Sequence, residues 1–97
     1  MAQFDLWRLK DGLLVVDLQT DLIGIDASRI VAPLRDAARY TAFPGLTPIV
    51  EIDGQRWIVR VQELAAVPAP ELRNRAGSLQ DMRDPLKHAL NILIDGV

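Results

Sequence analysis

Two runs near the start of the chain, residues 2–9 and residues 13–21, have the pattern of strands: apolar and polar residues alternate in the first, and every second residue from 14 to 18 is apolar in the second. Such alternation predicts β-strands with one buried face. Asp11 and Gly12 lie between the runs, and glycine accepts the positive φ that a tight hairpin turn requires. We therefore predict an antiparallel hairpin whose second strand has one buried face and one mixed face. The buried face holds Leu14, Val16 and Leu18, and the mixed face holds Val15, Asp17, Gln19 and Asp21.

The middle of the chain predicts one more strand and a turn. Residues 28–34 form a short apolar run, and we expect a third strand there. Pro33 has no N–H to donate, which predicts that this strand lies at a sheet edge or ends at the proline. Pro44 and Gly45 mark a turn.

A second hairpin is the clearest pattern in the chain. Residues 49–52 and residues 57–61 are rich in β-branched and aromatic side chains, and they flank Asp53 and Gly54. Residues 64–77 contain two prolines and predict a connection over the surface.

The last part of the sequence has helical periodicity. Asp84 is a suitable N-cap, Pro85 suits the first helical position, and Gly96 is expected to end the helix. A core-facing stripe falls at positions i, i+3, i+4 and i+7, and its residues are Leu86, Ala89, Leu90 and Leu93. Three more apolar residues, Ile92, Ile94 and Val97, lie off this stripe. This surplus apolar surface predicts a contact with a second molecule, either another copy of the chain or a partner.

Together these elements predict a mainly β protein with one C-terminal α-helix. We expect residues 1–97 to form a single domain, a small SH3-like antiparallel barrel capped by the helix.

The 97 residues carry a net charge of -2, which argues against nucleic acid as a direct partner. The chain has no cysteine, and no window reaches the about 20 apolar residues of a membrane span. Because the first residues do not resemble a signal peptide either, we expect a cytoplasmic protein.

Candidate catalytic chemistry is poorly supported. The chain has a single histidine, His88, which is expected to point to solvent from the helix. Asp17 and Asp21 share a strand face, but strand spacing places them about 13 Å apart, so a solvated face is expected. Eight of the nine arginines, Arg29 among them, alternate with acidic residues and suggest a mixed surface. We predict no catalytic residue, no metal site and no cofactor, and the sequence favours a binding protein over an enzyme.

Six segments, taken in order, resemble the CcdB family. They are Gln3–Phe4, Val16–Ile23, Arg29–Leu34, Leu46–Trp57, Leu64–Pro68 and the closing helix that ends in Gly96–Val97. The resemblance implies an SH3-like barrel that forms a homodimer without enzymatic activity. It implies a toxin of a type II toxin–antitoxin pair that binds the A subunit of DNA gyrase and traps the enzyme on cleaved DNA. It also implies neutralisation by a CcdA-like antitoxin, and repression of the operon by the toxin–antitoxin complex.

The resemblance also implies a gyrase-binding surface. Carried over to this sequence, that surface consists of Leu22, Ile23, Asn91, Ile94, Asp95, Gly96 and Val97. The chain departs from the family at Asp95, where well-studied members carry a tryptophan that stacks on an arginine of gyrase. A carboxylate can pair with the same guanidinium. The first hairpin is also shorter than in plasmid-borne members, in a region that contacts antitoxin in the family.

Two alternatives remain open from the sequence. The first is a non-toxic CcdB homologue that keeps only dimerisation and antitoxin binding. The second is an endoribonuclease of the MazF/Kid kind, which shares the barrel fold. The catalytic arginine and threonine groups of those enzymes are not found at recognisable positions in this sequence.

Overall fold

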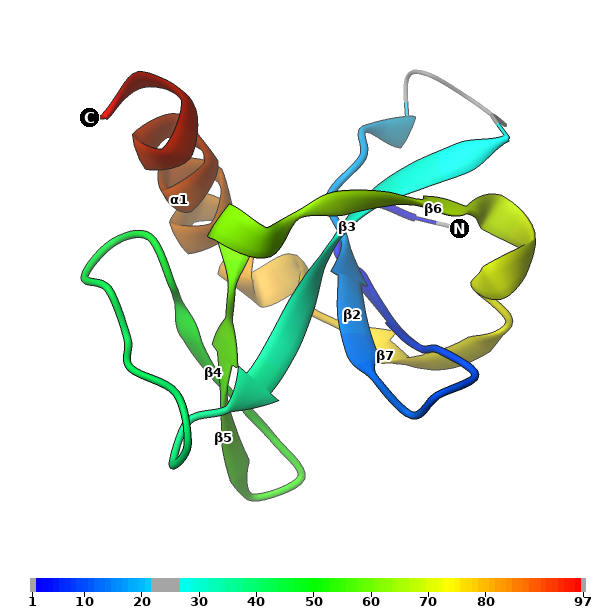
Figure 1. The fold of residues 1–97 in the computed structure, drawn as a ribbon, viewed down its shortest axis with the longest axis horizontal. Coiled ribbons are helices and arrows are strands. Elements are labelled where there is room, and N and C mark those ends of the chain that lie inside the picture. Colours follow the sequence, from blue (N-terminus) through cyan, green and yellow to red (C-terminus); the bar gives the residue numbers. More distant parts are fainter. Residues whose placement is uncertain (1, 22–26, 97) are drawn as a thin grey trace.

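The computed structural model describes residues 2–21 and 27–96. Within them the chain forms one antiparallel sheet and one α-helix (Figure 1). The sheet order is β4-β5-β3-β2-β1-β7, with β6 paired to β3, so the sheet is a half-barrel with β4 and β7 at its two ends. The strands are β1 (Asp5–Arg8), β2 (Leu14–Asp17), β3 (Ser28–Asp36), β4 (Ile49–Ile52), β5 (Gln55–Val59), β6 (Ala65–Pro68) and β7 (Asn74–Ser78). The helices are the 3₁₀ turns η2 (Val61–Glu63), η3 (Ala69–Glu71) and η4 (Gln80–Met82), and the α-helix α1 (Arg83–Asp95).

Both predicted hairpins are confirmed. In the first, the Leu9 N–H donates to the Leu13 carbonyl at 2.8 Å, and Gly12 has a φ of 91°. The turn therefore contains Lys10 as well as Asp11 and Gly12, one residue more than expected. In the second hairpin Asp53 and Gly54 have φ values of 53° and 81°, as a two-residue turn with both central residues left-handed requires.

The prediction for Pro33 was wrong. Pro33 lies inside β3, which is the longest of the described strands and pairs with β2, β5 and β6. On one side β3 pairs with β6 through residues 28–31 and with β5 through residues 34–36. Pro33 falls where the partner changes, so its missing N–H removes no bond from either ladder.

Residues 64–77 are not the predicted surface connection. They contain β6, which pairs with β3, and β7, which pairs with β1. Most side chains of these two strands are exposed, so their sequences lack the apolar alternation that marks a strand. Main-chain pairing to the edges of the sheet forms both strands.

The helix begins slightly earlier than predicted. Residues 80–82 form a 3₁₀ turn, Met82 occupies the N-cap position, and α1 begins at Arg83. Pro85 is therefore the third helical residue, where its missing N–H costs nothing because the first-turn N–H groups have no helical acceptor. Gly96 ends the helix as expected, with a φ of 77° and its N–H donating to the Ile92 carbonyl at 2.9 Å.

The sheet has apolar clusters on both faces. A first cluster packs α1 against the sheet and includes Leu6, Val16 and Leu86. A second cluster lies on the opposite face of β1, β2 and β3, because its members alternate with those of the first. Its buried residues are Trp7, Val15, Val31 and Leu72.

The predicted mixed face of the second strand is therefore buried. Val15 belongs to the second cluster and Asp17 and Gln19 are also buried, whereas Asp21, the last residue predicted for that face, is exposed. Trp7 lies in the second cluster and Trp57 packs against the first, which agrees with a packing role for both tryptophans.

Candidate protein-binding site at the end of the C-terminal helix

One side of the last turns of α1 is uncovered. Asn91, Ile94 and Asp95 are spaced i, i+3 and i+4, so they share a helix face, and all three are exposed. The Ile94 side chain is 75% exposed, the highest exposed fraction among the large apolar side chains of the described residues. The structure therefore brings together Asn91, Ile94, Asp95 and Gly96, which we name the helix-end surface. The other predicted binding residues, Leu22, Ile23 and Val97, lie outside the described residues.

The opposite side of α1 anchors it to the sheet. Leu86 and Ala89 are completely buried in the first cluster, and Leu90 and Leu93 pack partly buried against that cluster. The predicted core stripe is confirmed. Burying one side of the helix in this way fixes the direction in which the helix-end surface faces.

A tight turn also holds the helix. Gly45 has a φ of 79°, and a Cβ atom built on it would lie 2.7 Å from Ile92 Cδ1. The same atom would lie 3.7 Å from Nε2 of His88, which is exposed. Glycine suits this turn, because the backbone is left-handed and a Cβ would force the end of the Ile92 side chain to move. Ile92, one of the surplus apolar residues, is thus used inside the molecule.

The helix-end surface has a negative electrostatic character. The last turn of α1 carries Asp95 and contains no lysine or arginine. The unpaired carbonyls at a helix C-terminus carry partial negative charge, which adds to that of Asp95. This surface, an exposed isoleucine beside a carboxylate, matches a partner that presents an apolar group beside a cation.

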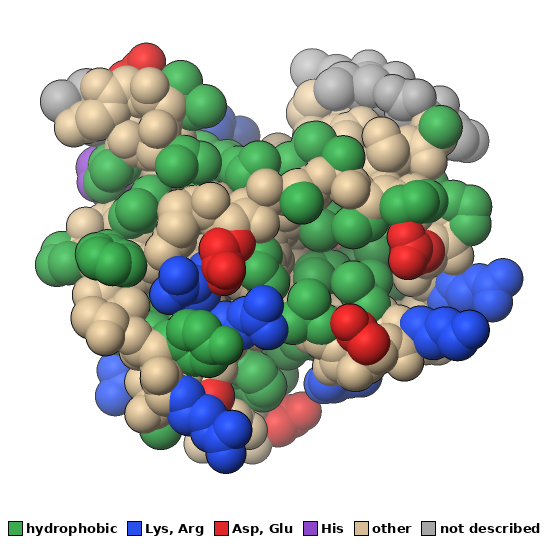
Figure 2. All heavy atoms as spheres, viewed as in Figure 1, with side chains coloured by type: hydrophobic (Ala, Val, Ile, Leu, Met, Phe, Trp, Pro, Cys, Tyr) green, Lys and Arg blue, Asp and Glu red, His purple; other side chains and the backbone are tan. Residues whose placement is uncertain are grey.

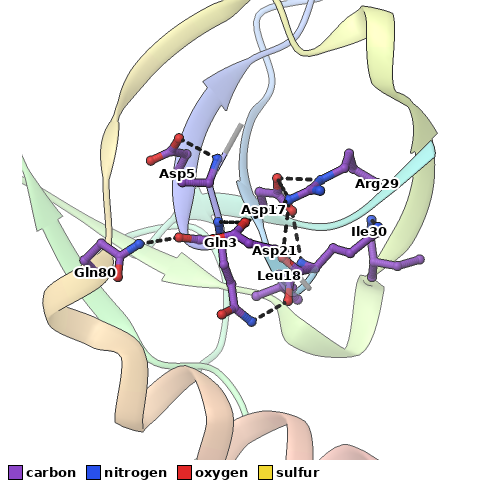
Figure 3. Close-up of polar contacts among 10 residues, drawn as sticks. Gln3, Asp5, Asp17, Leu18, Asp21, Arg29, Ile30 and Gln80 are labelled. Carbon is purple, nitrogen blue, oxygen red and sulfur yellow. Dashed lines mark hydrogen bonds and ion pairs between the residues drawn. The ribbon is translucent and has the colours of Figure 1, made fainter. Parts of the chain in front are cut away.

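A buried polar network holds the strand ends that precede residue 22 (Figure 3). Nε of Arg29 donates to Oδ2 of Asp17 at 2.9 Å, and its NH2 group also donates to the Gln19 carbonyl at 3.3 Å. The other Asp17 oxygen accepts the Gln19 N–H at 3.0 Å, and the Gln19 side chain accepts the Ile30 N–H. β2, β3 and the segment after β2 are thereby locked together.

The network extends to the N-terminal segment and to the approach to α1. The Gln3 N–H donates to Oδ1 of Asp21 at 2.9 Å, and the Gln3 amide donates to the Leu18 carbonyl at 3.1 Å. The Gln80 amide, in η4, donates to the Gln3 carbonyl. Elements distant in sequence are therefore joined around Gln3.

The sequence interpretation of these charges was wrong in two respects. Asp17 is fully buried instead of lying on a solvated face, and Arg29 is buried instead of belonging to a mixed surface. The available signal was an aspartate inside the apolar run of β2, since such a residue needs a buried cation or several donors.

The described part of the chain contains neither a metal-binding cluster nor a helix that could span a membrane. Within residues 2–21 and 27–96, no three His, Cys, Asp or Glu side chains gather closely enough to bind a metal ion. In the same residues, no helix has the length and apolar character needed to cross a membrane.

Comparison with known proteins decides the family. A family model described as CcdB protein matches residues 3–96. This chain belongs to the CcdB family. The resemblance drawn from the sequence is thereby confirmed, and with it the assignment to the toxins of toxin–antitoxin modules.

The CcdB-family fold of this chain is shared with other toxins. The Mycobacterium tuberculosis toxin MazF-mt6 superposes with a TM-score of 0.76 at 17% identity, over 96% of this chain and 97% of that chain. A second structure, described as an Mtb toxin, gives a TM-score of 0.75 at 16% identity, over 92% of this chain and 99% of that chain. At this identity the likeness concerns the fold, and it supports a mainly β half-barrel with a C-terminal helix. The homodimer stays a prediction.

Proposed function

We propose that this CcdB-family toxin binds the A subunit of DNA gyrase through its helix-end surface and traps the enzyme on cleaved DNA. The observation that carries the proposal is the exposure of Ile94 on the same face as Asn91 and Asp95. An exposed isoleucine costs free energy in water unless a partner covers it. In the proposed complex Ile94 is an apolar anchor of the kind that dominates protein interfaces.

Asp95 supplies the specificity in this proposal. Its carboxylate occupies the position of the family tryptophan and pairs with a guanidinium of gyrase. A charge-assisted pair of this kind depends on geometry and is stronger than a neutral hydrogen bond. The toxin acts as a binding protein without catalysis, so it needs no cofactor.

The remaining partners follow from the family. We propose that the toxin works as a homodimer, that a CcdA-like antitoxin neutralises it, and that the complex of the two represses the operon. In the dimer, two helix-end surfaces are available to the two A subunits of one gyrase molecule. This bivalency adds affinity without new contacts.

The deciding experiment is a gyrase supercoiling and DNA-cleavage assay with enzyme from the source organism. The wild-type protein is expected to trap cleaved DNA, and Ile94→Ala is expected to weaken trapping about ten-fold or more, as loss of an interface anchor does. The matched control is Ile49→Ala, because Ile49 is an exposed isoleucine on β4, outside the helix-end surface. Equal trapping by the wild type and Ile94→Ala contradicts the proposal.

A second candidate function is favoured by Asp95 itself, since it replaces the family's aromatic anchor. In that case the protein is a non-toxic homologue that keeps antitoxin binding. The variant Asp95→Trp, assayed in parallel, separates the two: trapping by Asp95→Trp alone supports the non-toxic homologue.

The MazF-like fold makes an RNA-cleavage assay a necessary companion experiment. We expect the purified protein to leave single-stranded RNA intact. Cleavage that is lost on arginine-to-alanine substitution would instead assign it to the endoribonucleases.

A further inference from the structure

The segment between β3 and β4, residues 37–48, carries an exposed aromatic side chain. Phe43 is 49% exposed, and among the large apolar side chains of the described residues only Ile94 is more exposed. Figure 2 shows hydrophobic side chains protruding at the left edge of the molecule, where Figure 1 places this segment. Single exposed apolar residues are common on protein surfaces. A fixed backbone and its position beside α1 distinguish Phe43 from such residues.

A buried threonine fixes the backbone of Phe43. The Phe43 N–H donates to the Thr47 hydroxyl oxygen at 2.7 Å, and that hydroxyl donates to the Phe43 carbonyl at 3.2 Å. The N–H groups of Leu46 and Thr47 also donate to the Phe43 carbonyl, each at 3.0 Å. Thr47 is only 4% exposed, so its hydroxyl is shielded from competing water. An aromatic ring on a fixed backbone loses little conformational entropy when a partner covers it.

The turn that carries Phe43 lies against α1. A Cβ atom built on Gly45 would lie 2.7 Å from Cδ1 of Ile92 and 3.7 Å from Nε2 of His88, so the turn reaches both side chains. Figure 1 shows the segment between β3 and β4 beside the helix. Phe43 lies two residues before Gly45 and therefore projects from a turn that is packed on α1. Its position relative to the helix is thus fixed.

The turn borders the face of α1 that bears the helix-end surface. His88, Asn91 and Asp95 are spaced i, i+3 and i+7, so they lie along one face of the helix, and all three are exposed. His88 meets the turn at one end of this line, and Asp95 belongs to the helix-end surface at the other end. Phe43 and Ile94 are therefore exposed apolar side chains at the two ends of one continuous surface.

Tyr40 is the other exposed aromatic residue of this segment, and its ring is already engaged. The guanidinium groups of Arg35 and Arg60 lie 5.7 Å and 5.2 Å from the centroid of the Tyr40 ring. Both distances fall within the about 6 Å range of a cation–π contact. A partner that covers Tyr40 must displace these cations, whereas the cation–π contacts within residues 2–21 and 27–96 do not include Phe43.

The size of a stable interface favours a contribution from both ends of the surface. A specific protein interface takes up about 20–30 residues on each partner. The helix-end surface is much smaller than this, so a subunit that covers it also covers neighbouring parts of the chain. Large apolar side chains that fill pockets of the partner supply most of the binding energy of such interfaces, and aromatic residues are prominent among them.

From these observations we propose that Phe43 is a second apolar anchor for the A subunit of DNA gyrase. The subunit presents one apolar pocket to Ile94 and another to Phe43, and the turn held by Thr47 sets the spacing of the two anchors. Phe43 thereby makes the toxin specific for gyrases that carry both pockets. This inference rests on the proposed function and deepens it, because it extends the gyrase-binding surface from the helix to the segment between β3 and β4.

The test measures binding of the purified gyrase A subunit to the full-length protein by surface plasmon resonance. Phe43→Ala is expected to weaken binding about ten-fold or more, mainly through faster dissociation, as loss of an interface anchor does. Tyr40→Ala truncates the other exposed aromatic ring of the segment and is the matched control, with an affinity expected within about two-fold of the wild type. Phe43→Leu keeps an apolar side chain on the turn and should retain part of the affinity.

Thr47→Val provides a second variant, because it keeps Phe43 and removes the hydroxyl that holds the backbone of Phe43 in place. We expect it to weaken binding about three-fold, the effect of losing one hydrogen bond. Thermal unfolding of each variant verifies that the sheet and α1 are intact.

Binding by Ile94→Ala separates a failure of this inference from a failure of the proposed function. If Ile94→Ala weakens binding and Phe43→Ala binds like the wild type, the second anchor is wrong and the proposed function stands. If the wild type does not bind the A subunit, both are wrong. A second copy of this chain is the competing occupant, so the inference is also overturned if Phe43→Ala lowers the mass of the protein's own assembly in light scattering.

Discussion

The guanidinium of Arg29 lies 2.8 Å from the carboxylate of Asp17, and both side chains are at least 95% buried. Because each charge is removed from water, each depends on the other. The pair joins β3 to β2 at the place where the chain leaves β2 for residues 22–26.

Arg29→Met is expected to destabilise the protein by about 3–5 kcal/mol, because it leaves the buried Asp17 charge without its cation. Urea unfolding followed by tryptophan fluorescence measures the loss. Arg56→Met, at an exposed position, is the control and should change stability by less than about 0.5 kcal/mol. A loss below about 1 kcal/mol in Arg29→Met would contradict this account. The double variant Asp17→Leu with Arg29→Met should recover part of the loss, since it leaves no unpaired charge.

Gly45→Ala tests the contact between the turn and the helix. A left-handed backbone costs a residue with a Cβ about 1–2 kcal/mol, and turning the end of the Ile92 side chain away from the new Cβ adds about 0.5–1.5 kcal/mol. Gly54→Ala has a similar φ of 81° but open space around the new Cβ, so it should show the backbone cost alone. The difference in unfolding free energy between Gly45→Ala and Gly54→Ala should shrink when Ile92→Ala is added to both. An unchanged difference would show that the Ile92 side chain does not obstruct the new Cβ.

Substitutions on the two sides of α1 should differ sharply in their effect on the free energy of unfolding. Leu86→Ala removes a completely buried side chain and is expected to cost about 2–5 kcal/mol. Ile94→Ala alters an exposed residue and should change stability by less than about 0.5 kcal/mol. Thermal unfolding of both variants tests this, and a large loss in Ile94→Ala would mean that Ile94 is covered within the protein's own assembly.

Asp95→Asn should stabilise the isolated protein. A negative charge in the last turn of a helix opposes the helix dipole, so its removal is worth about 0.3–1 kcal/mol at low salt. The gain should fade when thermal unfolding is repeated at high salt, because salt screens the interaction. If the same variant also weakens gyrase trapping, Asp95 serves binding at the expense of stability.

The sequence predicted those elements whose side chains carry a pattern. Both hairpins followed from Asp-Gly pairs, and the helix followed from the spacing of Leu86, Ala89, Leu90 and Leu93. By contrast, β6 and β7 depend on main-chain pairing with distant strands, and their exposed side chains carry no corresponding signal. Pro33 misled the interpretation because the change of partner along β3 is a property of the whole sheet.

Features of the site also divide into those that the sequence could predict and those that depend on the tertiary structure. The exposure of Ile94 could be predicted because it lies off the core stripe of its own helix. The second apolar cluster could not, because it combines side chains from the first hairpin, β3 and β6. Likewise, the buried pair of Asp17 and Arg29 is evident only when β2 and β3 are placed side by side.

The pairing of β1 with β7 has a consequence for synthesis on the ribosome. Asp5 at the start of β1 lies opposite Ser78 at the end of β7, so most of the 97 residues separate two neighbouring strands. A nascent chain cannot complete this sheet until residues 74–78 have emerged, and α1 with its helix-end surface is made later still. Products that terminate before residue 83 therefore lack both the finished fold and the proposed gyrase-binding residues of α1, so the partner-binding surface forms only after all seven strands have been made.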